Sequence, residues 1–208
     1  MVAWGTREPI DPVRFIGNRS SGKQGIALVE AAIARGAKVS MIAANLNFYV
    51  PGVDLVNVSS TSELLSAVDR LSKPFDFIVM PAAVSDYRVA NSSETKIKKS
   101  EVGAELSLRL VENPDVIVKL ANSARKINSH VKVVGFAAET HSGEALVRTA
   151  LEKLSKKGLD FVVANEVSHT KGFDSESNDV VIVGKDSATA VSGTKLEIAN
   201  SLFDILIQ

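Results

Sequence analysis

The 208-residue sequence contains no cysteine. This absence excludes a disulfide framework, a thiolate nucleophile and a zinc site built from cysteine ligands. Histidine is scarce as well. The three residues His130, His141 and His169 are scattered without the spacing of metal ligands, and we interpret them as surface residues.

Net charge and long apolar runs are also lacking. Lysine plus arginine and aspartate plus glutamate number 24 each, and this balance gives no support to a nucleic-acid or acidic-membrane partner. No segment approaches the roughly 20 apolar residues of a membrane span, and no charged-then-apolar leader is recognisable. With 45% hydrophobic and 23% charged residues, the composition is that of a globular protein, for which we expect a cytoplasmic location.

Strand-like and helix-like segments alternate along most of the chain. Apolar runs predict strands at 2–3, 37–44, 53–58, 75–80, 131–136, 159–164 and 180–184. Amphipathic patterns and caps predict helices at 26–35, after 60–62, and at 115–126, 143–157 and 196–207. Repeated strand–helix units predict a single domain, 1–208, of the α/β class: a three-layer, Rossmann-like, doubly wound and mostly parallel sheet.

Residues 88–112 interrupt this alternation. The segment holds the basic run KIKK at 96–99 and the alternating run ELSLRL at 105–110, which predicts a strand. An insertion of about 25 residues with its own strand indicates a lid or a dimerisation arm. The simpler alternative is that Lys96, Lys98 and Lys99 form a solvated charge run.

The segment GNRSSGKQG at 17–25 opens the first helix. Free backbone N–H groups at a helix N-terminus bind phosphate or carboxylate. The spacing of Gly17, Gly22 and Lys23 nearly matches the loop G-x-x-x-x-G-K-[ST], but Gln24 stands where a hydroxyl would hold magnesium. The pattern predicts an anion-binding loop that is not a standard P-loop, and the alternative is a glycine-rich turn that merely starts a helix.

Further polar blocks come directly after predicted buried strands. Taken singly, Asp86 could cap a turn, GFAAET at 135–140 could be an ordinary connection, and ANEVS at 164–168 could hold an Asx turn. In a parallel sheet, however, the carboxyl ends of the strands lie at the edge where ligands bind. Together with the anion loop, these blocks therefore predict a site at that edge.

The sequence resembles phosphopantothenoylcysteine synthetase, also called phosphopantothenate–cysteine ligase, from about residue 3 to residue 207. The matching blocks, in the family's order, are GTREPIDPVRFIGNRSSGKQG at 5–25, AAVSDYR at 82–88, KIKK at 96–99, NPD at 113–115, GFAAET at 135–140, ANEVS at 164–168 and GFDS at 172–175. The first block alone is long and specific.

The resemblance implies the ligase step of coenzyme A biosynthesis. In this family a nucleoside triphosphate activates the carboxylate of 4′-phosphopantothenate as an acyl-nucleotidyl anhydride, releasing pyrophosphate. The cysteine amine then forms the amide and releases the nucleoside monophosphate. The resemblance implies CTP rather than ATP, Mg²⁺ bound with the nucleotide, and a homodimer. The flavoprotein decarboxylase that many bacterial relatives carry is not part of the match, so we expect only the ligase activity.

The resemblance also assigns residues. Asn18 would stabilise the acyl-nucleotidyl intermediate, Arg14 would assist the cysteine step, and Lys96 would contact the triphosphate. The residues implied to bind the nucleotide are Met80, Pro81, Ala82, Asp86, Lys96, Pro114, Asp115, Val116, Ile117, Phe136, Lys153 and Lys157. The residues implied to bind substrate and its phosphate are Gly17, Asn18, Ser20, Ser21, Gly22 and Lys23.

One departure and two alternatives stand beside this interpretation. Trp4 occupies a position where the family usually has glycine, which affects the local phosphate contacts. A nucleotide-dependent oxidoreductase would need G-x-G-x-x-G after the first strand and an acidic residue about 20 positions later, and the chain supplies neither. The second alternative is a binding domain with a degenerate site.

Overall fold

Two sheets form the centre of the body. The computed structural model describes residues 1–45, 51–167 and 176–208. The first sheet is parallel, in the order β1 (Val2–Ala3), β4 (Ser40–Ala44), β5 (Asp54–Val58). The second has the order β12-β11-β10-β9-β6. In it β6 (Phe77–Met80), β9 (Lys132–Glu139) and β10 (Phe161–Glu166) are parallel, whereas β11 (Ser177–Gly184) and β12 (Ala188–Thr194) pair antiparallel.

The two sheets join where β1 and β6 end. Gly5 and Ala83 form a parallel bridge, and the Ala83 N–H donates to the Trp4 carbonyl over 2.9 Å. The combined order β5-β4-β1-β6-β9-β10-β11-β12 runs outward in both directions from β1 and β6. This is the switch point of a doubly wound sheet, where ligands bind beyond the strands' carboxyl ends. The predicted fold class is confirmed.

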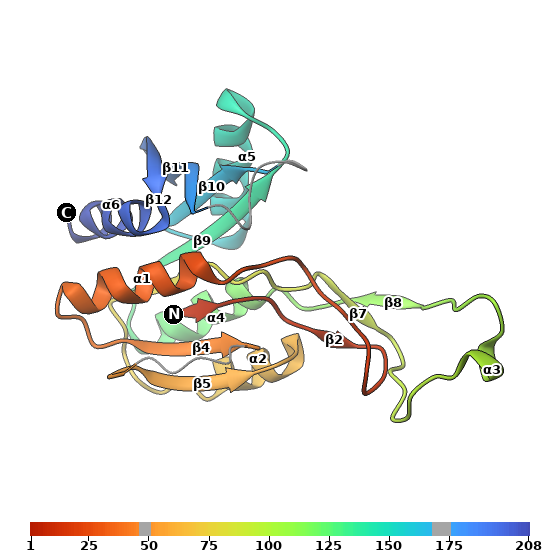
Figure 1. The fold of residues 1–208 in the computed structure, drawn as a ribbon. Helices are drawn as coiled ribbons and strands as arrows, with labels where there is room; N and C mark the ends of the chain where they lie inside the picture. The colour runs from red at the N-terminus through yellow and green to blue at the C-terminus, as the bar shows by residue number, and fades with distance from the viewer. Residues whose placement is uncertain (46–50, 168–175) are drawn as a thin grey trace.

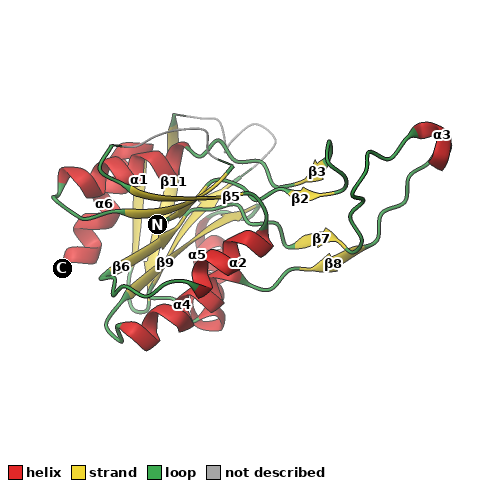
Figure 2. Ribbon diagram, turned by 90° about the horizontal axis from the view of Figure 1, so that it is seen from below, coloured by secondary structure: helices red, strands yellow, loops and turns green. Residues whose placement is uncertain are grey.

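Helices cover both faces of the sheets (Figure 2). On one face, α1 (Lys23–Ala34) and α6 (Lys195–Ile207) bury Leu28 and Leu202 in a core with Val134 and Val163. On the other, α2 (Thr61–Asp69), α4 (Val116–Ile127) and α5 (Gly143–Lys157) pack with Val133 and Val162. Strands buried on both faces have to be apolar throughout, which is why valine recurs in β9 and β10.

Local residues set the helix ends. The Ser60 hydroxyl accepts a hydrogen bond from the Glu63 N–H over 3.2 Å at the start of α2. Thr194 and Glu197 form a reciprocal capping box at the start of α6. At the other end of α5, Gly158 adopts φ 62°, a left-handed conformation that glycine accepts without steric cost.

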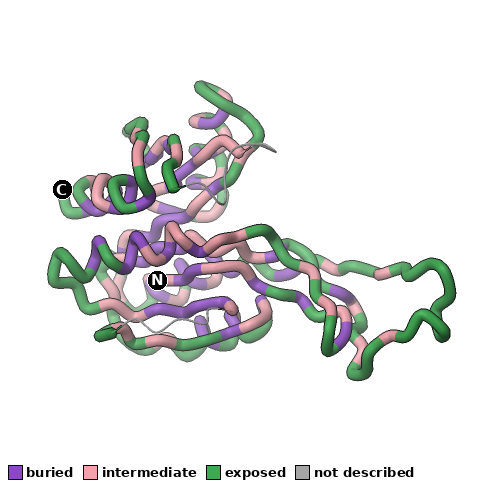
Figure 3. The backbone as a smooth tube through the Cα atoms, in the orientation of Figure 1, coloured by how far each residue is buried: buried purple, intermediate pink, exposed green. Residues whose placement is uncertain are grey.

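An arm projects from the carboxyl-end side of the sheets and is mostly exposed (Figures 1 and 3). It consists of the hairpin β2 (Glu8–Pro9) and β3 (Phe15–Ile16), the pair β7 (Tyr87–Val89) and β8 (Leu110–Glu112), and α3 (Lys99–Val102). Residues 88–112, where we expected an insertion, span the part of the arm from β7 to β8. The sequence did not reveal that the hairpin formed by residues 8–16 packs beside it.

Three expectations about strands need correction. The predicted strand at 105–110 is wrong, because β8 begins only at Leu110, opposite the three residues of β7. The blocks at 135–140 and 164–168 are not connections, because Glu139 and Glu166 still pair as members of β9 and β10. Strand β12 was not predicted.

Ser168 and the block at 172–175 lie outside the described residues. Within the described part of the chain, no helix is long and apolar enough to span a membrane.

Candidate active site

The predicted anion loop lies at the switch point, directly before α1. Gly22 is the N-cap of α1, with φ 70°. Among the described residues, no side chain caps this helix start, and its first turn holds no acidic residue. Among the described residues, the start of α1 therefore lacks the two features that complement the helix dipole at α2 and α6, a side-chain cap and a glutamate in the first turn. This end of α1 is suited to an anion.

The loop separates two clefts. The first, of about 510 Å³, opens toward the ends of β6, β9 and β10 and is lined by Pro81, Ala82 and Phe136 among others. The second, of about 480 Å³, opens toward β1 and β4 and is lined by Arg7 and Asn45 among others. The residues that line both clefts are Trp4, Gly17, Asn18, Arg19 and Ser20. The loop is thus a wall shared by two ligand-sized spaces.

Asn18 is fixed in this shared wall. Its side-chain amide donates to the Val84 carbonyl over 3.0 Å, which ties the anion loop to the segment following β6. Gly17 is constrained beside it, because an added Cβ there would lie 2.7 Å from the Thr6 carbonyl oxygen. The close approach of two backbone segments therefore requires glycine, and it sets the position of Asn18.

The phosphate-binding residues expected in the loop are only partly gathered. Ser20, Ser21 and Gly22 line the first cleft. Lys23 lines neither cleft and pairs with Glu176. The Lys23 ammonium lowers the pKa of the Glu176 carboxyl below its ordinary value.

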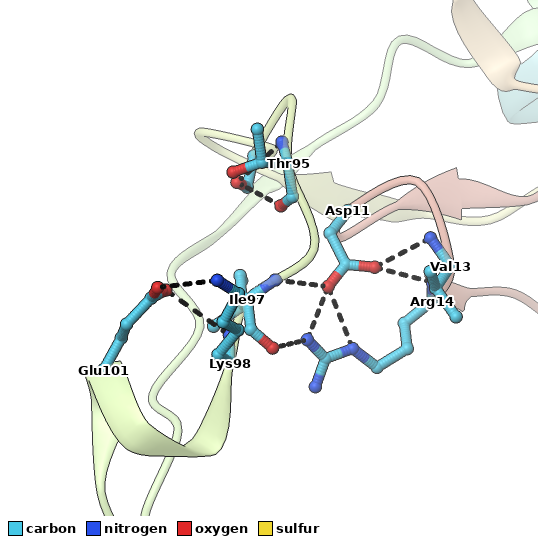
Figure 4. Close-up of polar contacts among 8 residues, drawn as sticks. Asp11, Val13, Arg14, Thr95, Ile97, Lys98 and Glu101 are labelled. Atoms are coloured by element: carbon cyan, nitrogen blue, oxygen red, sulfur yellow. Dashed lines mark hydrogen bonds and ion pairs between the residues drawn. The ribbon is translucent and has the colours of Figure 1, made fainter.

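Arg14 belongs to a group of polar contacts between the hairpin and the inserted segment (Figure 4). We call the contacts among Asp11, Arg14 and Ile97 the Asp11 lock. The buried Asp11 carboxylate accepts from Arg14 Nε over 3.0 Å and from the Ile97 N–H over 3.1 Å. Arg14 Nη2 in turn donates to the Ile97 carbonyl over 2.9 Å. The Arg14 guanidinium holds the pKa of Asp11 well below its usual range. Arg14 therefore orients the segment that carries Lys96, and it lines neither cleft.

Lys96 is exposed on the arm and lines neither cleft. Its neighbour Lys98 lies 3.9 Å from Glu101 at the start of α3. Within one copy of the chain, the structure does not bring Lys96 together with the anion loop. Asp11 and Arg14 hold the backbone of Ile97, the residue that follows Lys96, in place.

The residues expected at the nucleotide gather at the start of α4. The Asn113 N–H donates to the Asp86 carbonyl over 2.7 Å, and the Asn113 side chain donates to the Ser85 carbonyl over 2.9 Å. These bonds place Asp86 beside Pro114 and Asp115. The Asp115 side chain caps α4 and lies 3.0 Å from Lys157 of α5.

The remaining members of that set divide between the core and the protein surface. Met80, Val116 and Ile117 are buried in the core beneath α4 and α5, so only their backbone is available to a ligand. Lys153 lies 2.5 Å from Glu139, at the end of β9. Phe136 is on the opposite face of β9 from this core and lines the first cleft.

Three further polar residues, Asn165, Asn178 and Lys195, line the first cleft. Lys195, the first residue of α6, is 8% exposed, which is unusual for a lysine. Asn165 lies in one of the recognised blocks, but the other two are in segments without a motif.

Part of the longest motif has a structural role. Glu8, 2% exposed, accepts hydrogen bonds from the Thr61 N–H over 2.9 Å and from its hydroxyl over 2.7 Å. The Thr6 hydroxyl accepts from the Ser85 N–H over 2.9 Å. These buried contacts fix the segments after β1 and β6 to the start of α2. They hold the rim of both clefts.

In the described part of the chain, the carboxylates are not grouped as metal ligands. Across residues 1–45, 51–167 and 176–208, no group of three or more Asp, Glu, His or Cys side chains could hold a metal ion. Magnesium usually keeps several waters and binds phosphate oxygens together with one or two carboxylates. Two exposed carboxylates, Asp86 and Asp115, lie at the start of α4, and this pair would fit a Mg²⁺ ion that is carried by a nucleotide.

The fold and site define a Rossmann-like α/β domain whose anion loop lies at the sheet's switch point. The model of the DNA/pantothenate metabolism flavoprotein C-terminal domain matches residues 1–208, and the chain belongs to this family. The Mycobacterium tuberculosis H37Rv "Coenzyme A biosynthesis bifunctional protein CoaBC" is 40% identical over 100% of the chain and 51% of the relative. The protein of that name from Haemophilus influenzae is 38% identical over 100% and 50%. The chain thus spans about half the length of the curated relatives it matches.

Solved structures share this fold. The C-terminal domain of a CoaBC protein is 31% identical, with a TM-score of 0.75 over 99% of the chain and 92% of that domain. The DNA/pantothenate metabolism flavoprotein from Streptococcus pneumoniae has a TM-score of 0.82 at 24% identity, covering 99% and 96%. A Cab2 variant in complex with phosphopantothenate-cysteine shares the fold at 18% identity, with a TM-score of 0.74 over 99% and 83%.

Proposed function

We propose that this chain is a cytoplasmic phosphopantothenate–cysteine ligase of coenzyme A biosynthesis. The observation that carries the proposal is the anion loop forming the shared wall of two clefts at the switch point. A ligase of this kind must hold two polyanions side by side, and backbone N–H groups at a helix start offset part of their repulsion. The family membership and the ligase resemblance of the motifs support the same assignment.

The proposed reaction has two steps. First, a carboxylate oxygen of 4′-phosphopantothenate attacks the α-phosphorus of the nucleotide, and the bond to pyrophosphate breaks. The cysteine amine then attacks the acyl carbon, loses a proton and displaces the nucleoside monophosphate, which retains that carboxylate oxygen. Asn18, fixed by Val84, would donate or accept at the anhydride between the clefts. Catalysis on this account relies on positioning and charge stabilisation rather than acid–base groups.

The nucleotide would extend from the shared wall toward the start of α4. Asp86 and Asp115 lie there, and Lys153 and Lys157 are paired with Glu139 and Asp115. A triphosphate would compete with these carboxylates for the two ammonium groups, as an anion of higher charge. We propose CTP as the nucleotide. Mg²⁺ bound to it would neutralise phosphate charge.

We also propose a homodimer formed through the arm. Five large apolar side chains are exposed close together in this part of the chain: Val13 61%, Phe15 51%, Tyr87 54%, Leu106 40% and Leu110 42%. Exposed apolar patches of this kind mark interaction surfaces. A two-fold pairing would bury them symmetrically, Leu108 included. It would also give the arm a fixed position from which Lys96 could reach a triphosphate.

Release of pyrophosphate tests the ligase assignment. Purified protein receives phosphopantothenate, cysteine, Mg²⁺ and either CTP or ATP, and we expect pyrophosphate only when the acyl substrate is present, faster with CTP. A protein that ignores both nucleotides but oxidises or reduces a nicotinamide cofactor would be an oxidoreductase. One that binds CTP and turns over nothing would be a degenerate binding domain. Either result would refute the proposal.

A further inference from the structure

Trp4 stands where the two clefts meet, in a backbone conformation that L-residues rarely adopt. Its φ is 70°, and only Asn45 (φ 60°) shares a positive φ among the described non-glycine residues. Asparagine is enriched in this left-handed region, whereas a bulky residue is strained there. Such strain persists only where the surroundings impose it, and it is concentrated at functional sites.

The surroundings of Trp4 explain how the strain is imposed. Its carbonyl accepts from the Ala83 N–H over 2.9 Å, which anchors the backbone at the switch point. Its indole lies against two glycines of the anion loop. An added Cβ at Gly22 would come 1.8 Å from indole Nε1, and one at Gly25 would come 3.6 Å from Cζ3. The loop therefore leaves room for the indole, and the strained φ places the ring on the first turn of α1.

Indole Nε1 is the polar atom that this arrangement brings to the helix start. An indole N–H can only donate, and it usually finds an acceptor when it is partly buried. In the described part of the chain, no acceptor bonds to Nε1. It lies beside Gly22, the N-cap whose helix also lacks a side-chain cap. An oxyanion at the start of α1 would meet the indole N–H together with the loop.

We propose that Trp4 is a specificity-determining residue of the first cleft, whose indole N–H donates to the phosphate monoester of the acyl substrate. This inference rests on the proposed ligase function and deepens it. It assigns the phosphate end of that substrate to the helix start beside Gly22 and predicts that Trp4 sets the preference for phosphorylated over unphosphorylated pantothenate. The reactive carboxylate would then extend toward Asn18.

The tryptophan reports on its own site, because Trp4 is the only tryptophan in the chain. Titration of the unmodified protein with phosphopantothenate should change the intrinsic tryptophan emission saturably, and inorganic phosphate should cause the same change at higher concentration. Pantothenate, and chloride at matched ionic strength, should leave the emission unaltered. An unchanged emission at saturating phosphopantothenate would overturn the proposal.

Trp4→Phe keeps an aromatic ring but removes the donor. We expect the KM for phosphopantothenate to rise about 10-fold or more, as for a lost hydrogen bond to a charged group, with kcat retained and binding of pantothenate unaltered. If the affinities for phosphopantothenate and pantothenate fell equally, the Trp4 ring would contribute only packing, and the proposal would be wrong. A protein that shows the emission change but never releases pyrophosphate would refute the ligase and keep the phosphate contact. Normal turnover without an emission change would support the ligase and refute the phosphate contact of Trp4.

Discussion

The body and the arm of this protein are held together by different interactions. In the body, large side chains such as Leu28, Leu120 and Leu202 are fully buried between sheet and helices. In the arm, large apolar side chains are exposed, and a buried carboxylate, Asp11, connects the hairpin to the inserted segment. The body is therefore stable through packing, whereas the arm depends on a few charged contacts and on whatever covers its apolar surface.

This difference also separates two kinds of site residue. Asn18 and the loop at 17–22 belong to the body, where Asn18 is held by Val84 and lines the first cleft. Lys96 belongs to the arm, outside both clefts. Binding requires preformed contacts, whereas closing a site over a hydrolysable anhydride requires a part that moves. The predictions below test whether body and arm can be disrupted independently.

The largest effect on stability should come from the body. Leu202→Ala removes a side chain with 0% exposure, so the free energy of unfolding should fall by about 2–5 kcal/mol. Leu106→Ser on the arm should change the stability of the protomer by less than about 0.5 kcal/mol, but it should weaken self-association. Urea unfolding and light scattering measure the two. Monomeric unmodified protein at micromolar concentration would contradict the role of the arm.

A smaller change in free energy should remove activity without affecting the fold. Asn18→Asp places a like charge beside the phosphates, so amide formation should fall about 100-fold or more, as for loss of one preorganised donor. The melting temperature should stay unchanged. The matched control is Asn122→Asp, on the exposed side of α4, which should retain full activity. Normal turnover by the Asn18 variant would remove this residue from the mechanism.

The smallest effect should be local to the arm. Asp11→Asn weakens the contacts to Arg14 and Ile97, so proteolysis within 88–112 should become about 10-fold faster. Asp54→Asn, which breaks an exposed pair with Lys73 in the body, is the control and should have no effect.

The pH dependence of the Asp11 lock follows from the direction in which the pKa of Asp11 is shifted. Because the folded-state pKa of Asp11 is depressed, its stabilisation is complete above the ordinary aspartate pKa and is lost only as the pH falls through the depressed value. The rate of arm cleavage, corrected for protease activity, should therefore stay constant between pH 8 and pH 5. A rise in that interval would mean that another group controls the arm.

The sequence predicted features that depend on local chemistry. The α5 range was predicted as found, since amphipathic periodicity and Gly158 define it. The cap at Ser60 was predicted because a serine followed by Glu63 is a local signal for a helix start. The strand at 105–110 was wrong because its alternation lacks a partner: β7 offers only three residues. Strand β12, with its small and polar residues, forms because β11 lies beside it.

The site was predictable to the extent that its residues are contiguous. The anion loop and the blocks beside it could be found from spacing and from the ligase resemblance. The division of the loop's surroundings into two clefts could not, because it depends on how the segments after β1 and β6 lie beside the loop. Nor could the pairing of Arg14 with Asp11, through which Arg14 orients the arm. Lys195 was missed because its burial arises from the packing of α6 against the rest of the body.

Transfer of oxygen isotope tests the central claim most directly. Phosphopantothenate labelled with ¹⁸O in its carboxylate is converted with cysteine and CTP, and the products are analysed by mass spectrometry. Because the carboxylate oxygen attacks the α-phosphorus and leaves with it, one ¹⁸O atom should appear in the nucleoside monophosphate and none in pyrophosphate. Label in inorganic phosphate, or an unlabelled nucleotide product, would contradict activation through an acyl-nucleotidyl anhydride.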